Sequence, residues 1–359
     1  MANPANFPEP PYPLHESIKD LIDPEYASFY NEYLLHAPQV HYQPVAASRV
    51  GGKLIPGGTD PIPVGKTVDV QLLRKESSGP PVPVRVFIPP GDPPAASGKG
   101  KGWPLFLWYH GGGWVLGNID SENSLCTNLC VRANCVVITT DYRLAPEHPF
   151  PAAVHDAWET ALWVVSGAAA AHLQDELGVD GGFDLDLAKL AIGGSSAGGN
   201  LAAVVTQKAL YHRAFAEETR FLFQILVVPV LDNTASPETS ASYKTYEHTA
   251  ALPAEKMLWY RRHYLPDEAD WSNPEASPLL VASEAKFTKL PPALVVVAGL
   301  DVLRWEGEEY ARTLNAAGVE AEVHVMEGVP HPFIVMDAVL QKGREGVSLL
   351  CDRLAAAFK

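Results

Sequence analysis

Apolar and polar positions follow two different patterns along the chain, and each pattern predicts its own kind of strand. Residues 67–76 (TVDVQLLRKE) and 82–90 (VPVRVFIPP) alternate with a period of two, as half-buried strands do. Farther along, short and nearly continuous apolar runs alternate with helical stretches, at residues 103–110, 134–142, 187–194, 221–231, 292–300 and 320–328. Such runs are typical of strands that helices bury on both faces. The chain therefore predicts an α/β fold with a mostly parallel eight-stranded sheet, in which two antiparallel strands lead into about six parallel ones.

One segment interrupts this alternation. Residues 232–272 follow a strand but hold an irregular polar run and then an aromatic-rich helical stretch, PAEKMLWYRRHYL. This is longer than a plain strand-to-helix connection of about 2–6 residues. We expect the insertion to pack with residues 1–50 and to cover the sheet. The predicted domains are thus a helical cap (1–50 and 232–272) and a catalytic domain (51–231 and 273–359).

Composition and charge exclude several classes of partner. The 359 residues are 47% hydrophobic and 19% charged, which is typical of a soluble globular protein. A formal net charge of −15, with no run of Lys or Arg longer than two, leaves no basic face for a nucleic acid. No uninterrupted apolar stretch reaches the roughly 18 residues of a membrane span.

The N-terminus and the cysteines bear on the compartment. Residues 1–20 lack the basic and apolar regions of a secretory signal. The four cysteines are better explained as buried thiols in a reducing compartment than as disulfides or a metal site; they are Cys126, Cys130, Cys135 and Cys351. We therefore expect a cytoplasmic protein without a bound metal.

The segment LAIGGSSAGGN, residues 190–200, follows a buried run and precedes a helical stretch. Reacting groups in open parallel sheets lie at the carboxyl ends of strands. A sharp turn that presents a hydroxyl there needs small residues two positions before and two after it. Ser196 has glycine at both positions, whereas Ser195 has alanine at the second, so Ser196 is the predicted nucleophile. The alternative is a glycine-rich helix N-terminus that binds an anion or packs closely.

A serine hydroxyl needs a base that takes its proton and an acid that orients the base. In a nucleophile-elbow protein the order along the chain is serine, acid, histidine. Five histidines follow the serine: His212, His248, His263, His324 and His331. His331 lies in a loop just past the last predicted strand, at the same edge of the sheet, and is the predicted base. Asp301 ends the preceding strand and is the predicted acid, with Asp232 and Glu306 as alternatives.

The sequence YHGGGW, residues 109–114, ends the first parallel strand and carries a glycine triplet. Three glycines let backbone N–H groups turn inward without side chains in the way, and such donors stabilise a tetrahedral oxyanion. We expect the N–H groups of Gly112, Gly113 and Ala197 to form this oxyanion hole. His110 heads the loop and is expected to hold it by hydrogen bonding and not to transfer protons.

Together these motifs resemble the hormone-sensitive-lipase-like family of α/β-hydrolases. The resemblance extends over about residues 80–355 and is carried by HGGGW (110–114), DYRLAPEHPFPAAVHD (141–156), GGSSAGGNLA (193–202), GLDVLRWEG (299–307) and HPF (331–333). It implies an α/β-hydrolase fold with a cap, hydrolysis of carboxylic esters with short or medium acyl chains, and no cofactor. It also implies a triad of Ser196, Asp301 and His331, with oxyanion donors at Gly112, Gly113 and Ala197.

The resemblance also bears on residues outside the triad. Arg143, Glu147 and Asp156 are expected to pair and to lock the loop beside the active site. The family usually has an acidic residue directly before the nucleophile, and here Ser195 takes that position. We expect this change to alter the local hydrogen bonding and the response to pH while leaving the triad intact.

The sequence thus predicts a serine carboxylesterase acting on a small-molecule ester, and a homodimer is the one protein assembly that we keep open. Trp114, Trp259 and Tyr260 are candidates for lining the substrate pocket, with core packing as the alternative. A lactonase or an amidase would use the same triad, because the motifs do not separate these substrates. A receptor on the same fold, like the plant gibberellin receptors, fits less well, because those receptors lack the catalytic histidine and this chain keeps His331.

Overall fold

The structure, a computed structural model, describes residues 8–50, 56–93, 102–178, 183–215, 219–281 and 284–359. In this part of the chain eight strands form one sheet in the order β1-β2-β4-β3-β5-β6-β7-β8. The strands are β1 (Lys66–Leu72), β2 (Val82–Ile88), β3 (Trp103–Tyr109), β4 (Val136–Thr140), β5 (Leu185–Ser195), β6 (Phe223–Val227), β7 (Ala293–Leu300) and β8 (Ala321–Pro330). β1 and β2 are antiparallel, as are β2 and β4, and the other neighbouring pairs are parallel. The predicted α/β fold with its mostly parallel eight-stranded sheet is confirmed.

Burial along the strands follows the two patterns in the sequence. In β1 the buried positions alternate with exposed ones and are Val68, Val70 and Leu72. Every residue of β3, β4 and β7 is buried. Successive side chains of a strand point to opposite faces, so Phe106 and Trp108 join one hydrophobic core while Leu105 and Leu107 join the other. The central strands therefore need helices on both sides.

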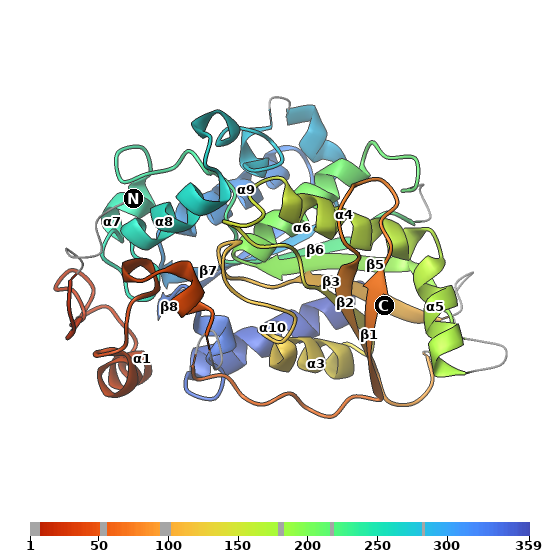
Figure 1. Ribbon diagram of the computed structural model, residues 1–359, viewed down its shortest axis with the longest axis horizontal. Helices are drawn as coiled ribbons and strands as arrows, with labels where there is room; N and C mark the ends of the chain where they lie inside the picture. Colours follow the sequence, from red (N-terminus) through yellow and green to blue (C-terminus); the bar gives the residue numbers. More distant parts are fainter. Residues whose placement is uncertain (1–7, 51–55, 94–101, 179–182, 216–218, 282–283) are drawn as a thin grey trace.

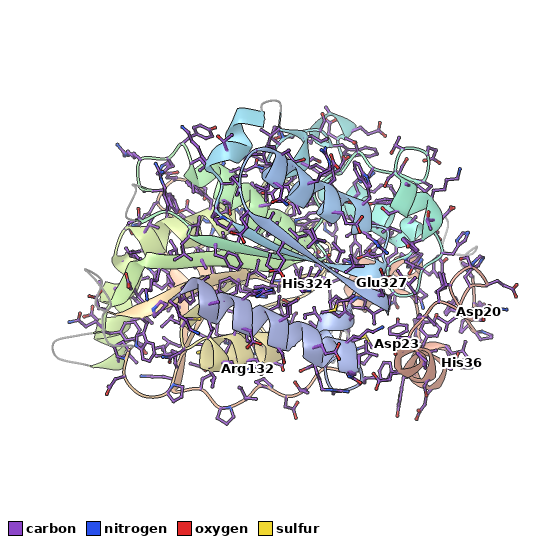
Figure 2. All side chains as sticks on the ribbon, turned by 180° about the vertical axis from the view of Figure 1, so that it is seen from behind. Asp20, Asp23, His36, Arg132, His324 and Glu327 are labelled. Atoms are coloured by element: carbon purple, nitrogen blue, oxygen red, sulfur yellow. The ribbon has the colours of Figure 1, made fainter. Side chains whose placement is uncertain are left out.

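Five helices cover the two faces of the sheet. One face packs against α3 (Asn123–Arg132) and α10 (Gln341–Ala357), and the other against α4 (Ala152–Val165), α6 (Ala197–Ala209) and α9 (Arg304–Ala316). Figure 1 shows α3 and α10 below the sheet and α4 and α6 above it, with α5 (Ala168–Leu177) beyond the end of α4. From behind, in Figure 2, α10 lies below the sheet and in front of α3, and His324 marks the edge strand β8.

Short helices connect and cover these layers. Those near the N-terminus are α1 (Pro24–Phe29), η2 (Tyr30–Leu34), η3 (Val40–Tyr42) and α2 (Val45–Ser48). The insertion after β6 holds α7 (Ala241–Thr245), α8 (Ala254–Tyr264) and η5 (Glu268–Asp270). The remaining ones are η6 (Pro278–Leu280), η7 (Glu284–Lys289) and η8 (Phe333–Val335).

The N-terminal segment contacts both the insertion after β6 and the loops after β3 and β4. The hydroxyl of Tyr42 donates to the carboxylate of Glu255 on α8, at 3.0 Å. Arg49 donates from Nε to the carbonyl of Val115 at 2.9 Å and forms an ion pair with Glu147 at 2.9 Å. Segments that are about 200 residues apart in the sequence thus share one surface of the molecule.

The four cysteines are free thiols and all are buried. Burial raises the pKa of each thiol above its usual range. Among the helices that the structure describes, none has the length and apolar character needed to cross a membrane.

Candidate active site

The predicted nucleophile, acid and base come together at the carboxyl edge of the sheet. Ser196 follows the last residue of β5, Asp301 follows β7, and His331 follows β8. β6 lies between β5 and β7, and β8 pairs directly with β7, so the three residues end parallel strands at one edge. The common direction of the strands brings together residues that lie up to 135 positions apart in the sequence.

Ser196 sits on a sharp turn between β5 and α6. Its φ of 53° lies in the left-handed region, which is strained for a residue with a side chain. Glycines surround the turn because there is no room for a Cβ. One on Gly194 would overlap the backbone of Gly198, and one on Gly198 would overlap the carbonyl of Tyr109. The fold therefore fixes both glycines of the frame that singles out Ser196 over Ser195.

The three side chains form a hydrogen-bonded chain. Nε2 of His331 lies 2.9 Å from Oγ of Ser196, and Nδ1 of the same ring lies 2.7 Å from Oδ2 of Asp301. Asp301 is 1% exposed, and its Oδ1 also accepts the backbone N–H of Leu303, so the carboxylate has a fixed orientation. This arrangement allows proton transfer from the hydroxyl to the imidazole.

The other candidate acids and bases lie elsewhere. Asp232 accepts from the backbone and hydroxyl of Thr234. The Glu306 carboxylate accepts the backbone N–H groups of Leu231 and Asp232. Burial raises its pKa well above the usual range. His324 pairs with Glu322 on the outer strand. None of these contacts involves the serine.

The glycine triplet forms a tight loop after β3. Gly112 has a φ of 124° and Gly113 one of 60°, and a Cβ on Gly112 would overlap the carbonyl of Leu116. Among the described residues, the N–H groups of Gly112, Gly113 and Ala197 donate to no backbone or side-chain acceptor. The loop therefore offers two unused donors beside Ser196, and the start of α6 offers the third.

His110 holds the start of this loop. Its Nδ1 lies 2.7 Å from the carbonyl of Gly111, and its ring stacks on Tyr142 at 4.3 Å. The Tyr142 hydroxyl donates to the His110 carbonyl at 2.7 Å. Burial lowers the pKa of His110 to about 4, so the ring is neutral at physiological pH. These contacts agree with a role in holding the loop.

Glu122, which the sequence analysis did not single out, lies beside both serines. Its Oε1 accepts from the Ser195 hydroxyl at 2.5 Å and from the Gly111 N–H at 3.0 Å, and its Oε2 accepts from Nε1 of Trp108 at 2.6 Å. Burial raises the pKa of this carboxyl, against the opposing effect of the three hydrogen bonds. A carboxylate therefore stands next to the nucleophile turn even though Ser195 is not acidic. No sequence motif indicates this contact, because Glu122 stands at the start of a helix, 73 positions before Ser195.

A cavity of about 200 Å³ opens over Ser196 and His331. Its floor is formed by the glycine loop and Glu122, and its other side by residues 34–40 and 251–260. Tyr260 lines this cavity, as predicted for the pocket. Trp114 and Trp259 are not among its described lining residues.

The two tryptophans make other contacts. Trp114 is fully buried and stacks on Tyr264 at 4.2 Å. Trp259 packs edge-on against Tyr260 and His263. Trp114 thus belongs to the core, and Trp259 supports the lining residue Tyr260 from behind.

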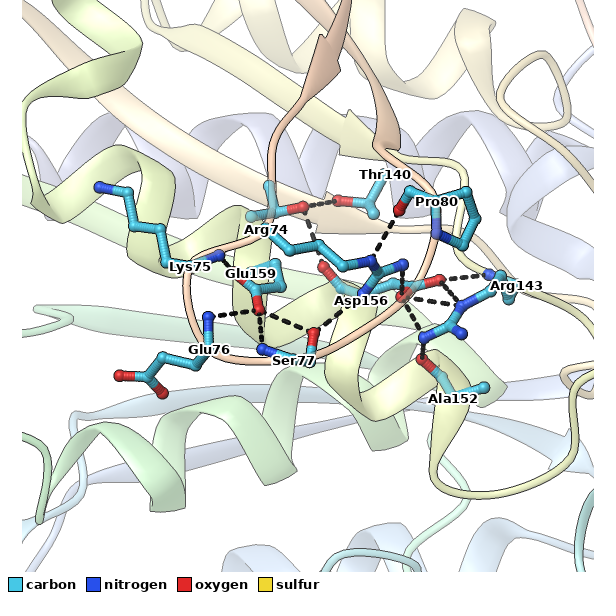
Figure 3. A network of polar contacts seen from close by, with 11 residues as sticks. Arg74, Lys75, Glu76, Ser77, Pro80, Thr140, Arg143, Ala152, Asp156 and Glu159 are labelled. Carbon is cyan, nitrogen blue, oxygen red and sulfur yellow. Dashed lines mark hydrogen bonds and ion pairs between the residues drawn. The ribbon is translucent and has the colours of Figure 1, made fainter.

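A polar network braces the loop after β4 (Figure 3). Asp156, 1% exposed, accepts from Arg143 at 2.8 Å and from Arg74 at 2.6 Å. The expected pairing of Arg143 with Asp156 is present. The expectation for Glu147 was wrong: it pairs with Arg49 at 2.9 Å, because its side chain is 58% exposed and faces the N-terminal segment.

Among the described residues, no group of three or more His, Cys, Asp or Glu side chains is placed to hold a metal ion. The polar groups around Ser196 are an imidazole, a carboxylate and backbone N–H groups.

Comparisons with known proteins give a consistent result. A family model described as the alpha/beta hydrolase fold matches residues 106–335. An AB hydrolase superfamily protein of Schizosaccharomyces pombe is 47% identical over 96% of this chain and 97% of its own length. An ethyl acetate hydrolase of Pseudomonas putida is 34% identical over 80% of this chain and 81% of its own length. Among solved structures, an esterase of Pyrobaculum calidifontis is 35% identical with a TM-score of 0.70, and covers 82% of this chain and 86% of its own.

Proposed function

The chain belongs to the α/β-hydrolase family, among its hormone-sensitive-lipase-like carboxylesterases, and on that premise we propose that it hydrolyses short- to medium-chain carboxylic esters through a Ser196–His331–Asp301 triad. The observation that carries the proposal is the pair of distances on His331, 2.9 Å to Ser196 and 2.7 Å to Asp301. The names of relatives as esterases and carboxylic ester hydrolases support the reaction class.

In the first half of the reaction the Ser196 hydroxyl attacks the ester carbonyl carbon, and its proton passes to Nε2 of His331. Asp301 accepts the N–H at Nδ1, which holds the ring in the correct tautomer and stabilises the imidazolium that forms. The carbonyl oxygen becomes an oxyanion and accepts from the N–H groups of Gly112, Gly113 and Ala197. Collapse of this intermediate breaks the bond to the alcohol oxygen, which leaves with the proton from His331, and an acyl-enzyme remains.

In the second half a water molecule gives a proton to Nε2 of His331 and attacks the acyl carbon. The same three donors stabilise the second oxyanion, and the Ser196 oxygen leaves with the proton from His331. The carboxylic acid is then released. Every proton is accounted for by one imidazole, so the proposed cycle needs no cofactor.

The cavity supports a preference for small substrates. Its volume of about 200 Å³ lies below the roughly 300–1,000 Å³ of pockets that take drug-sized ligands. Residues 1–50 and 232–272 form the cap in this proposal, since the lining residues opposite the serine come from 34–40 and 251–260. Tyr260 and Met257 on α8 contribute apolar surface for the acyl or alcohol chain.

The test compares Ser196→Ala with Ser195→Ala on p-nitrophenyl butyrate. We expect Ser196→Ala to lower kcat at least ~10⁴-fold and to abolish labelling by a fluorophosphonate, because the nucleophile is lost. Ser195→Ala keeps the nucleophile and should keep the labelling. Most of the activity surviving in Ser196→Ala would refute the proposed triad. A panel of esters of graded chain length, with a lactone and an anilide, then defines the substrate class, and a faster lactone or anilide would replace the ester assignment.

A further inference from the structure

The two halves of the proposed oxyanion hole come from different elements. Gly112 and Gly113 lie in the loop after β3, whereas Ala197 begins α6 at the end of β5. An oxyanion binds well only when donors from both sides lie about 2.7–3.1 Å from its position. A small shift of the loop relative to the turn would therefore weaken the site without disturbing the triad.

Glu122 bonds to both halves with one oxygen. Its Oε1 accepts from the N–H of Gly111, directly before the donor glycines, and from the hydroxyl of Ser195, directly before the nucleophile. Its Oε2 accepts from Trp108 of β3, which fixes the direction of the carboxylate. Glu122 also lines the cavity itself.

The contacts of Glu122 favour its ionised form. All three partners donate hydrogen bonds, and a carboxylate accepts on both oxygens, whereas a protonated carboxyl would direct one O–H toward donors. Burial opposes ionisation and raises the pKa of the group. A partly buried carboxylate with three donors on it is an arrangement that holds its partners in place.

We infer that Glu122 is a positioning residue for the reaction: its carboxylate ties the glycine loop to the nucleophile turn and so sets the geometry of the oxyanion hole. The inference rests on the proposed function, since it assumes that Gly112, Gly113 and Ala197 bind the oxyanion. It also accounts for Ser195. Position 195 carries no negative charge itself, and its hydroxyl instead donates to the carboxylate of Glu122.

The first experiment replaces the carboxylate without changing its shape. Glu122→Gln puts an amide N–H against a donor, so we expect kcat on p-nitrophenyl butyrate to fall roughly tenfold to a hundredfold while KM changes less than threefold. Glu159→Gln is the matched control. Glu159 is also buried and accepts from the N–H groups of residues 75–77, but it lies in the network of Figure 3 and not on the cavity. It should lower the melting temperature and leave kcat per folded molecule within twofold.

A second experiment moves the negative charge to the other partner. Ser195 lies close to Gly111, since a Cβ on Gly111 would stand 2.8 Å from Oγ of Ser195. We therefore expect the longer side chain of an aspartate at position 195 to reach the Gly111 N–H, which now donates to Glu122. Ser195→Asp in the unchanged protein sets two carboxylates against each other and should lower kcat. In the double variant Glu122→Gln/Ser195→Asp, the carboxylate at position 195 again faces the N–H of Gly111. We expect the kcat of the double variant to be at least fivefold above that of Glu122→Gln alone.

The inference is supported if Ser195→Asp lowers kcat when Glu122 is present and raises kcat in the Glu122→Gln variant. A purely structural loss would lower kcat in both. A threefold or smaller effect of Glu122→Gln on kcat, or equal signs in the two backgrounds, overturns it. Fluorophosphonate titration of active serine in each variant corrects for misfolded protein. Failure of the proposed function is distinct, since it would appear as full activity in Ser196→Ala with Glu122 unchanged.

Discussion

The floor and the cover of the cavity are built in different ways. The floor consists of Gly111–Gly113, Glu122, Ser196 and His331, and hydrogen bonds connect Gly111 to Glu122 and Ser196 to His331. The cover consists of lining residues from 34–40 and 251–260, which are mostly apolar and include one cation, Lys256. Lys256 donates to the carbonyl of Ala251 at 2.7 Å.

The contrast separates two tasks. The floor is built on strand ends, and parallel neighbours in a sheet cannot move independently, which suits chemistry that requires fixed geometry. The cover is attached through contacts between short helices and a few side chains, so its shape is free to differ without loss of the reaction. We therefore assign chemistry to the floor and substrate preference to the cover.

The largest effect should come from removing the charge that orients His331. We expect Asp301→Asn to lower kcat about 10⁴-fold, because an amide at this place favours the wrong tautomer of the imidazole. The control is Asp232→Asn, in the segment after the neighbouring strand β6, whose carboxylate accepts from the backbone and hydroxyl of Thr234. It should keep kcat within about fivefold. Steady-state kinetics on p-nitrophenyl butyrate measures both, and equal losses would contradict the assignment of the acid.

The support behind the floor should affect stability and not chemistry. Asp156→Ala leaves the guanidinium groups of Arg74 and Arg143 without their buried partner, which should lower the free energy of unfolding by about 3–5 kcal/mol. Glu147→Ala breaks only the exposed pair with Arg49 and should cost less than about 1 kcal/mol. Urea unfolding gives both values. A large drop in kcat per folded molecule of Asp156→Ala would show that the network takes part in the floor.

The same contrast explains what the sequence predicts well. Each residue of the predicted triad directly follows a strand, and the direction of parallel strands brings such residues to one edge whatever their separation in the chain. Glycine spacing distinguishes Ser196 from Ser195, because steric exclusion at Gly194 and Gly198 is a local property. The fold and the triad geometry therefore follow from local patterns together with one topological rule.

Contacts that depend on tertiary packing could not be predicted from the sequence. Glu122 meets Ser195 only because a helix start packs against a strand end, and no spacing rule connects them. Trp114 directly follows the glycine triplet, yet its backbone has a φ of 58° and its ring turns into the core against Tyr264. Glu147 lies close to Arg143 in the sequence and still pairs with Arg49 of the N-terminal segment. Side-chain direction in loops is decided by neighbours that the sequence does not reveal.

Gly113 is the place where floor and cover touch. A Cβ on Gly113 would overlap the ring of Tyr260, so Gly113→Ala should push α8 away from the loop or move the loop itself. We expect kcat/KM to fall by about 30-fold, equivalent to about 2 kcal/mol of overpacking. Adding Tyr260→Ala removes the clash, so the double variant should have a kcat/KM at least fivefold above that of Gly113→Ala. If the double variant is no better than Gly113→Ala, the strain lies in the loop backbone at φ 60° and not in the contact with the cover.

The smallest effect should come from the cation in the cover. Burial lowers the pKa of Lys256 from 10.5 to about 8, and no carboxylate of the described residues forms an ion pair with it. Below pH 8 the folded protein therefore holds a charged group in an unfavourable place. Between pH 8 and 10.5 the unfolded chain keeps this proton while the folded protein releases it, so this group makes stability rise with pH.

Lys256→Met should accordingly stabilise the protein at pH 7, by about 1 kcal/mol because the side chain is only partly buried. The gain should shrink as the pH rises through 8 to 10.5, and Lys244→Met, at an exposed position on α7, should show no such trend. Urea unfolding of the variants against the unchanged protein at several pH values measures the difference. Lys256→Met should leave kcat on p-nitrophenyl butyrate within about threefold, because the residue belongs to the cover. A tenfold or greater loss of kcat on this neutral ester would mean that the cover takes part in the chemistry, and the division of the cavity into two tasks would fail.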